Sequence, residues 1–294
     1  MRVDAGSYYD TLPGLAHQCG DIWRNLPSFG LLGPKHCSGI VITPACDLSW
    51  QKSDTLTYLP IIPIRSYFAT DAALPVVVDR VATALQVSGC APSPQWSAQS
   101  YVSPDETELS ALESTVEQFR ASKQHPARIL TALDRVIAGT TVLRLINNQA
   151  IDPIDTDVLM NLFGSEWAKI KEKIITNSYS SALHFLPFDT QDNVFSGVPA
   201  HSVALFRYPV TIPLKILNHA QETFDSTWSD KVATFSTPDS LKTAVSPEQP
   251  IKLLSLKASF LSDLLTRFAA LYNRIGSPDF TKHTVNMYSS EVDT

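Results

Sequence analysis

Two stretches of strand-like sequence lie on either side of one long helical stretch, and this order constrains the fold most. The first stretch spans residues 20–70 and the second spans residues 181–220. Neither is long enough to form a complete sheet, and an unpaired sheet edge is a hazard for association. We therefore expect the two stretches to pair with each other, with residues 71–180 inserted between them as a mainly helical unit.

Residues 39–50, with the sequence GIVITPACDLSW, form the centre of the first stretch. The small and β-branched residues at its start are typical of a buried strand. We expect regular pairing to loosen at Pro44, which has no backbone N–H, and the strand to end in the polar pair Cys46-Asp47. A second apolar run, LTYLPIIPI at residues 56–64, follows a polar turn, so the two runs predict an antiparallel hairpin.

Helical periodicity dominates residues 103–177 and returns near the end of the chain. Ser103 and Glu106 have the spacing of a capping box, and apolar residues then recur at steps of three and four. Residues 129–145 and 155–177 predict two further helices, whereas the short apolar runs around residues 76–85 fit either type of element. A last amphipathic helix is predicted within residues 251–276, packed on the sheet and ended by glycine and proline.

The composition favours a folded chain that does not attract nucleic acid by its overall charge. Of its 294 residues, 44% are hydrophobic and 18% are charged, which allows a sizeable core. The formal net charge is −6, so nucleic acid is not a favoured partner. The densest basic cluster, Lys169, Lys171 and Lys173, has Glu166 and Glu172 among it and predicts a solvated helix face.

The sequence also bears on location. The first residues contain no apolar core of a signal peptide, and no apolar run approaches the length of a membrane span. We expect a cytoplasmic protein that contacts no membrane. Its four cysteines are too few for a disulfide scaffold and should be reduced in that compartment.

Several short motifs resemble the PemK/MazF toxin family. They are GDIW at residues 20–23, GIVITP at 39–44, YLPIIPI at 58–64 and GVPAHSV at 197–203. The last is similar to the Gly-Leu-Pro-x-x-Ser-Val stretch of that family, and the resemblance covers under a third of the chain. It implies an α+β fold, in which a small SH3-like (PemK-like) β-barrel carries a large α-helical insertion and a C-terminal helix.

The catalytic pattern departs from that family. Its active members carry an arginine just before the second strand, where this chain has residues 37–39, CSG. Their other catalytic residue is a Thr or Ser after Pro-Ile, and here Arg65 and Ser66 follow. Such RNA cleavage needs a cation and a group that moves the proton. For a divergent endoribonuclease, the resemblance implies Arg65, Ser66, Lys35 and His36.

The chain also resembles an uncharacterised set of bacterial proteins. In that set a Val-Ile-Ser/Thr-x-x-Cys-Asp strand precedes a barrel, and an Arg-Phe-Ala…Arg-Ile/Val-Gly-x-Pro helix ends the chain. Cys46-Asp47, Arg267 and Arg274 occupy the matching positions here. Members of the set resemble accessory genes of bacterial conflict systems, which is an association and not a mechanism.

The candidate binding residues are weighed against structural roles. They are Cys46, Asp47, Trp50, Arg267 and Arg274. Cys46 is a thiol or zinc-ligand candidate, but the chain has no CxxC or CxxH pair, so no metal is expected. A buried small hydrophobe at Cys46 and a turn cap at Asp47 are the favoured alternatives. The two arginines could anchor a partner or pair with nearby acids.

No cofactor-binding motif is found. The chain has no phosphate-cradling Gly-rich loop, no Rossmann fingerprint and no GxSxG. A cysteine protease would need Cys, His and Asn or Asp in contact, and His36, His184 and His201 are candidates by residue type alone. The leading hypothesis is a non-catalytic protein-interaction or regulatory subunit, of a bacterial anti-phage or toxin-related system, which binds another protein of that system. The alternative is the divergent endoribonuclease.

Overall fold

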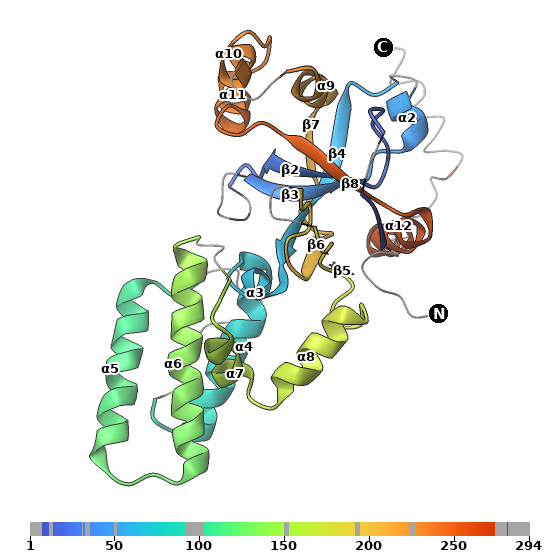
Figure 1. Cartoon of the computed structure of the whole chain (residues 1–294). Helices are drawn as coiled ribbons and strands as arrows, with labels where there is room; N and C mark the ends of the chain where they lie inside the picture. The colour runs from blue at the N-terminus through green and yellow to red at the C-terminus, as the bar shows by residue number, and fades with distance from the viewer. Residues whose placement is uncertain are drawn as a thin grey trace.

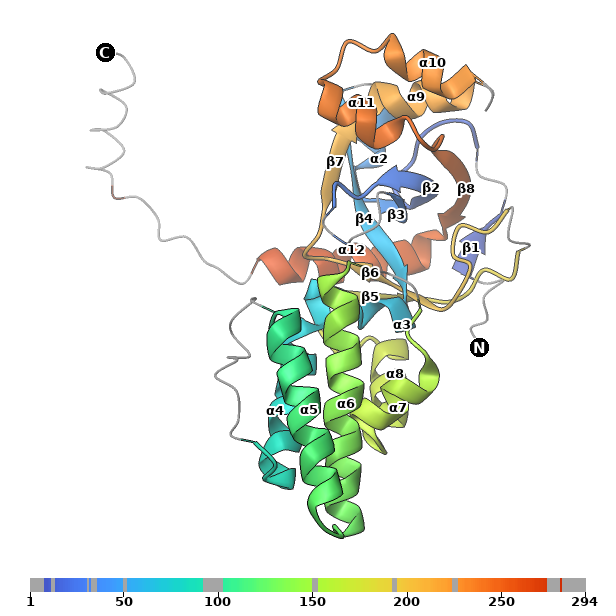
Figure 2. The ribbon, with the colours of Figure 1, turned by 90° about the vertical axis from the view of Figure 1, so that its left-hand side faces the viewer.

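The protein has mixed α and β structure, as predicted. The computed structural model describes residues 8–11, 14–30, 32, 36–49, 52–91, 103–149, 153–191, 195–223, 227–273 and 281. An eight-stranded antiparallel sheet lies in the middle of the described molecule (Figure 1). The larger group of helices lies at one end of this sheet and a smaller group lies at the other (Figure 2).

The sheet is built from strands of both predicted stretches, because the long central strand pairs with strands of each. The strands are β1 (Tyr9–Asp10), β2 (Asp21–Pro27), β3 (His36–Val41), β4 (Thr55–Pro63), β5 (Leu183–Leu186), β6 (Ser202–Leu205), β7 (Val210–Pro213) and β8 (Ile251–Leu256). Their order is β1-β8-β2-β3-β4-β6-β5, and β7 also pairs with β4. The predicted β3–β4 hairpin is confirmed by its register, in which Val41 pairs with Tyr58.

The expected closed barrel is corrected to an open, curled sheet. Within the described ranges, β1 and β5 lie at the two ends of the strand order and no strand pair joins them. The two ends nevertheless approach each other, since Tyr9 Oη donates a hydrogen bond of 2.7 Å to Pro187 O. Ile22, Ile40 and Leu59 are fully buried in the core that this curvature encloses.

The central strand ends earlier than the sequence indicated. β3 stops at Val41, and Cys46-Asp47 lie in a short helix, α2 (Ala45–Ser49). Pro44 cannot donate to a strand ladder, but its carbonyl accepts the N–H groups of Asp47 and Leu48. A proline at this point therefore starts a helix instead of extending the strand.

The insertion between β4 and β5 is helical. Its elements are α3 (Ile64–Tyr67), η1 (Asp71–Ala73), α4 (Leu74–Ser88), α5 (Glu106–Ser122), α6 (Ala127–Asn147), α7 (Thr156–Phe163) and α8 (Glu166–Ile175). They do not stand apart from the sheet, because their core also contains Ile62, Phe185 and Val203 from the strands. The ambiguous run around residue 80 is helix α4.

Two details of these helices differ from the sequence prediction. The capping box of α5 is formed by Asp105 and Glu108 and not by Ser103 and Glu106, because the helix begins after Asp105. The single helix expected over residues 155–177 is split into α7 and α8. Gly164 adopts a φ of +58° there, which glycine tolerates and a helix does not.

The predicted last helix is wrong in its first part, because residues 251–256 are strand β8. This strand lies between β1 and β2, and its Leu254 pairs with Ile22. The helices that complete the fold are α9 (Leu214–Glu222), α10 (Trp228–Ala233), α11 (Asp239–Val245) and α12 (Ala258–Tyr272). α12 packs on the sheet core through the fully buried Leu264. No described helix combines the length and the apolar character needed to cross a membrane.

Candidate functional site

Arg65 lies where the chain passes from the sheet into the helical insertion. β4 ends in Pro63, which pairs with Ser202 of β6, and the single turn of α3 follows at once. The Ile64 N–H donates to His201 O at 3.0 Å. The β4–β6 pairing therefore brings two residues that are 136 positions apart, Arg65 and His201, to the same end of the sheet.

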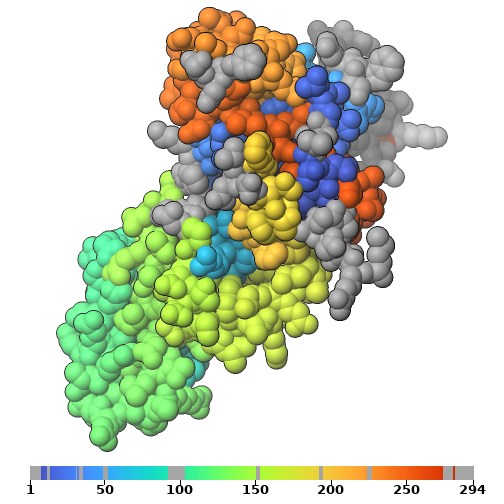
Figure 3. Space-filling view, viewed as in Figure 1, coloured from blue at the N-terminus to red at the C-terminus, as the bar shows by residue number. Residues whose placement is uncertain are grey.

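A pocket of about 340 Å³ opens beside Arg65, and we name it the α3–α8 pocket. Its apolar lining residues are Pro63, Ile64, Pro153, Trp167, Ile175 and Ala200, and its polar ones are Arg65, Thr156, Lys171 and His201. Figure 3 shows the blue surface of α3 between the yellow-green surface of α7 and α8 and the yellow surface that leads into β6. The pocket thus lies at the junction of the sheet and the helices.

One wall of the α3–α8 pocket is a fixed aromatic group. Trp167 is 5% exposed, with its ring stacked on Phe163 at a centroid distance of 5.9 Å and edge-on to Phe68 at 5.5 Å. The Lys171 ammonium lies 5.7 Å from the Trp167 ring centroid. This cation–π contact keeps the charge at the pocket wall although the rest of the lysine is exposed.

The opposite wall carries His201 in a defined tautomer. Its Nδ1 accepts a hydrogen bond of 3.0 Å from the Phe188 backbone N–H. A ring nitrogen that accepts a hydrogen bond bears no proton, so the neutral imidazole carries its proton on Nε2. His201 therefore offers an N–H donor from the side of the ring that Phe188 leaves open.

Arg65 is held loosely at the pocket rim. Its Nη1 donates to Ile154 O at 3.3 Å, which uses one of its five N–H groups. In the described part of the chain, no carboxylate lies within ion-pair distance of Arg65 or Lys171. The pocket consequently presents three nitrogen donor groups, from α3, α8 and the start of β6, above an apolar lining.

The structure does not bring the four expected nuclease residues together. Ser66 is fully buried, and its Oγ has no hydrogen-bond partner among the described residues. His36 lies in β3, where its Nε2 is 2.9 Å from Ala244 O of α11, at the other end of the sheet from α3. Lys35 lies outside the described residues. Among the members of this group that the structure describes, only Arg65 lines the α3–α8 pocket.

The Cys46-Asp47 pair forms no larger constellation within the described ranges. Cys46 is exposed, which corrects the expected burial, and its Sγ lies 3.5 Å from Asp47 Oδ1. No group of three His, Cys, Asp or Glu residues there could hold a metal ion.

Burial raises the pKa of Cys37 to about 12 and that of Cys19 to about 11, so these thiols stay protonated at neutral pH. Trp50 lies outside the described residues.

Arg267 pairs with a nearby acidic residue, which is the second of the two roles considered for it. Its Nε lies 2.9 Å from Asp263 Oδ2 one turn earlier in α12, and its Nη1 donates to Asn177 O at 3.3 Å. The hydrogen bond to Asn177 joins α12 to the turn after α8. Arg274 lies outside the described residues.

Sequence patterns gave little indication of the α3–α8 pocket. Lys171 belongs to the cluster predicted to be a solvated helix face, Trp167 belongs to the apolar stripe of the same helix, and His201 was a candidate by residue type alone. No spacing links residues 65, 171 and 201, which meet because β4 pairs with β6 and α8 packs beside β5. Comparison with models of known protein families, with curated proteins and with solved structures found no match for this chain.

Proposed function

We propose that this chain is a non-catalytic interaction module, which holds a segment of another protein in the α3–α8 pocket. The observation that supports this most is the combination of an apolar lining with donor groups that have no carboxylate partner among the described residues. Apolar surface supplies affinity, and a few placed polar groups fix orientation. The position of the pocket lets one bound segment contact both the sheet and the helices.

A binding role accounts for the pocket more simply than a catalytic one does. General acid–base catalysis requires groups within hydrogen-bond reach of one reacting atom. Ser66, which matches the Thr or Ser of the family only with a shift, is fully buried within α3 and does not line the pocket. Arg65, Lys171 and His201 offer N–H donors, and the hydroxyl of Thr156 at the start of α7 can donate or accept.

The biological setting that we propose follows from the resemblances described above. A divergent PemK-like, SH3-like sheet without the arginine of active toxins fits a subunit that recognises another protein of an anti-phage or toxin-related system. The pairing of the two strand stretches is compatible with that relationship. The setting is cytoplasmic in this proposal, and the partner is another component of the same system.

Site-specific photo-crosslinking in the native host tests this proposal. A benzophenone amino acid is placed at Ile175, which is 50% exposed at the pocket, and for control at Met160, which is 51% exposed and does not line it. We expect one protein adduct from position 175, none from position 160, and loss of the adduct when Lys171→Glu is added. Identical adducts from both positions, or turnover of a substrate by the purified chain, would contradict the proposal.

A second candidate function is a divergent PemK/MazF-like endoribonuclease. The observation in its favour is that a cation, Arg65, and a proton-transfer group, His201, line one pocket. It predicts that expression is toxic and that purified protein cleaves single-stranded RNA. Both effects should be lost in Arg65→Ala and in His201→Ala, and a harmless, inactive wild type would remove this candidate.

A further inference from the structure

We infer that the α3–α8 pocket binds an acidic peptide segment, in which a carboxylate lies next to a large apolar side chain. This inference rests on the proposed function and names the chemistry of the partner. It follows from the charge, the donor geometry and the aromatic wall of the pocket.

The charge at the pocket is positive although the chain as a whole is negative. Among the described residues, Arg65, Lys171 and His201 are its titratable lining residues, and no carboxylate of that part of the chain lines it. Asp155, next to the lining, caps α7 by accepting the Asp157 N–H at 3.1 Å. Glu166, at the start of α8, is bound by Arg80 at 2.6 Å. A negatively charged group is therefore the complementary occupant.

The donors suit a carboxylate. The guanidinium of Arg65 can offer two parallel N–H groups to the two oxygens of a carboxylate, which makes such pairs strong and directional. The Nε2–H of His201 and the ammonium of Lys171 add donors from the other two elements. The other N–H groups of Arg65 are available to a carboxylate, because in the described structure only its Nη1 donates a hydrogen bond, to the carbonyl of Ile154.

The remaining lining favours an aliphatic side chain over a nucleobase. Pro63, Pro153 and Ala200 line the pocket, and Ile175 contributes a half-exposed side chain. Bases bind proteins by stacking on open aromatic faces. Trp167 offers no such face, because its ring stacks on Phe163 and carries the Lys171 ammonium. The observations therefore favour an acidic peptide over RNA.

The test measures fluorescence anisotropy with three labelled nonapeptides at low salt. Their central residues are Glu-Leu, Gln-Leu and Glu-Ser, flanked by Gly and Ser. We expect the Glu-Leu peptide to bind at least about tenfold more tightly than either other peptide, the size of effect that one lost charged or apolar contact gives. Addition of salt should weaken the binding, because the ion pair between the peptide carboxylate and Arg65 is partly exposed.

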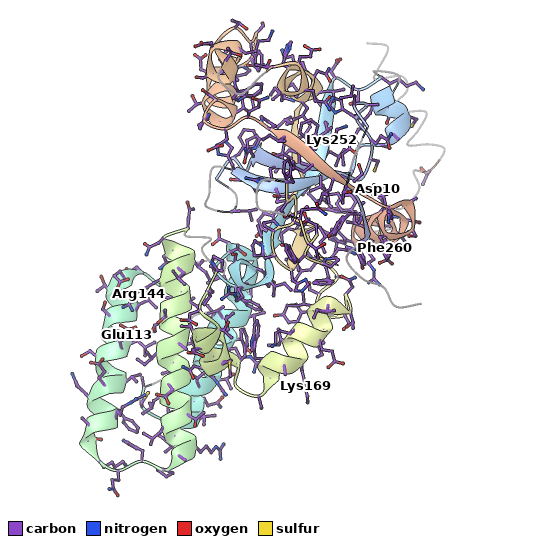
Figure 4. All side chains as sticks on the ribbon, in the orientation of Figure 1. Asp10, Glu113, Arg144, Lys169, Lys252 and Phe260 are labelled. Carbon is purple, nitrogen blue, oxygen red and sulfur yellow. The ribbon has the colours of Figure 1, made fainter. Side chains whose placement is uncertain are left out.

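Charge-removing variants at the pocket and on the far side of α8 provide the matched control. Arg65→Gln and Lys171→Gln should each weaken Glu-Leu binding by about fivefold or more. Lys169→Gln removes the same charge from α8 on the side that points away from the sheet (Figure 4) and should leave binding unchanged. The exposed Lys171 variant keeps the test valid if Arg65→Gln lowers the melting temperature.

Three results would overturn the inference. They are equal binding of the Gln-Leu and Glu-Leu peptides, unchanged binding in both Arg65→Gln and Lys171→Gln, and displacement of the peptide by a short RNA at lower concentration. Capture of a partner from position 175 together with any of these would refute the acidic peptide and keep the proposed function. Failure of the crosslink as well would refute both.

Discussion

Lys252 Nζ lies 3.2 Å from Asp21 Oδ2, and the two side chains are only 5% and 2% exposed. Lys252 also donates to the carbonyls of Gly14 and Ala16 at 2.6 and 2.8 Å, while Asp21 accepts the Gln18 N–H at 2.8 Å. Figure 4 shows Lys252 on β8 in the middle of the sheet. This pair joins β2 near one end of the chain to β8 near the other and fixes the segment before β2.

Removing Lys252 should therefore destabilise the whole sheet. We expect Lys252→Ala to lower the free energy of unfolding by about 3–5 kcal/mol, because Asp21 is left as a buried, unpaired charge. Urea denaturation measures the change. The surface pair of the half-buried Lys242 and the exposed Asp239 supplies the control, where Lys242→Ala should cost less than about 1 kcal/mol. Equal effects of the two substitutions would show that the buried pair has no special role.

The contact between α4 and α6 depends on Gly139. A Cβ added at Gly139 would overlap Cγ2 of Val81. Although alanine favours helix by about 1 kcal/mol over glycine, we expect Gly139→Ala to cost about 1–3 kcal/mol through overpacking. Val81→Ala should relieve the overlap, so the double variant should be more stable than the sum of the single effects indicates. A Gly139→Ala variant that unfolds at higher denaturant than wild type would contradict this packing.

The α5–α6 hairpin is fastened by Arg144 and Glu113, which lie between the two helices (Figure 4). Arg144 donates to both carboxylate oxygens of Glu113, at 2.6 and 2.8 Å, and these hydrogen bonds lower the pKa of Glu113 from its ordinary 4.5. A lowered carboxyl pKa stabilises the fold above pH 4.5, and this contribution is lost as the pH falls through the folded-state pKa.

Arg144→Met should accordingly cost about 1 kcal/mol at pH 7, since the pair is partly exposed. The difference from wild type should be smaller at pH 3 than at pH 7, because this contribution decreases as the pH falls below 4.5 towards the lowered pKa of Glu113. Urea denaturation of both proteins at the two pH values provides the measurement. A difference that stays constant between them would mean that Arg144 acts through packing alone.

His184 makes the stability of the fold sensitive to acid. It is 1% exposed in β5, burial lowers its pKa to about 4, and its Nδ1 lies 3.9 Å from Asp263 Oδ2 of α12. The unfolded chain takes up the proton near pH 6.5, so the stabilising contribution is complete above pH 6.5 and is lost progressively down to about pH 4.

A His184→Gln variant should lack this loss. Relative to the variant, we expect wild type to lose about 3 kcal/mol of unfolding free energy between pH 6.5 and 4. Chemical denaturation at half-unit steps of pH measures it. Parallel pH profiles for the two proteins would show that His184 is not the titrating group.

The hairpin and the helical insertion could be predicted because their information is local. Two apolar runs around residues 39–43 and 56–64 indicate β3 and β4, and periodic apolar residues indicate α5 and α6. β8 could not be separated from α12, since Leu253 and Leu256 fit a helical step while Leu254 and Leu256 fit the alternation of a strand. Residues 251–256 form a strand because they pair with the open edge of β2, where Ile22 lies opposite Leu254.

The pocket could be predicted from the sequence only in part. The PemK-like motif singled out Arg65, but it also singled out Ser66, which α3 turns into the core. His201 and Lys171 reach the pocket through the β4–β6 pairing and the packing of α8. These are tertiary relationships, and the helical period within α8 shows only that Lys171 lies one turn after Trp167, with Lys169 on the other side of the helix.

Methyl NMR of the full chain tests the α3–α8 pocket most directly as the binding site. The protein is labelled at Ile and Met methyl groups and titrated with the Glu-Leu peptide. We expect the signal of Ile175 to shift in proportion to occupancy, while those of Met160 and Ile251, which are exposed but do not line the pocket, stay in place. Shifts at Met160 or Ile251 without a shift at Ile175, or no shift at all, would contradict the assignment of the pocket as the partner's binding site.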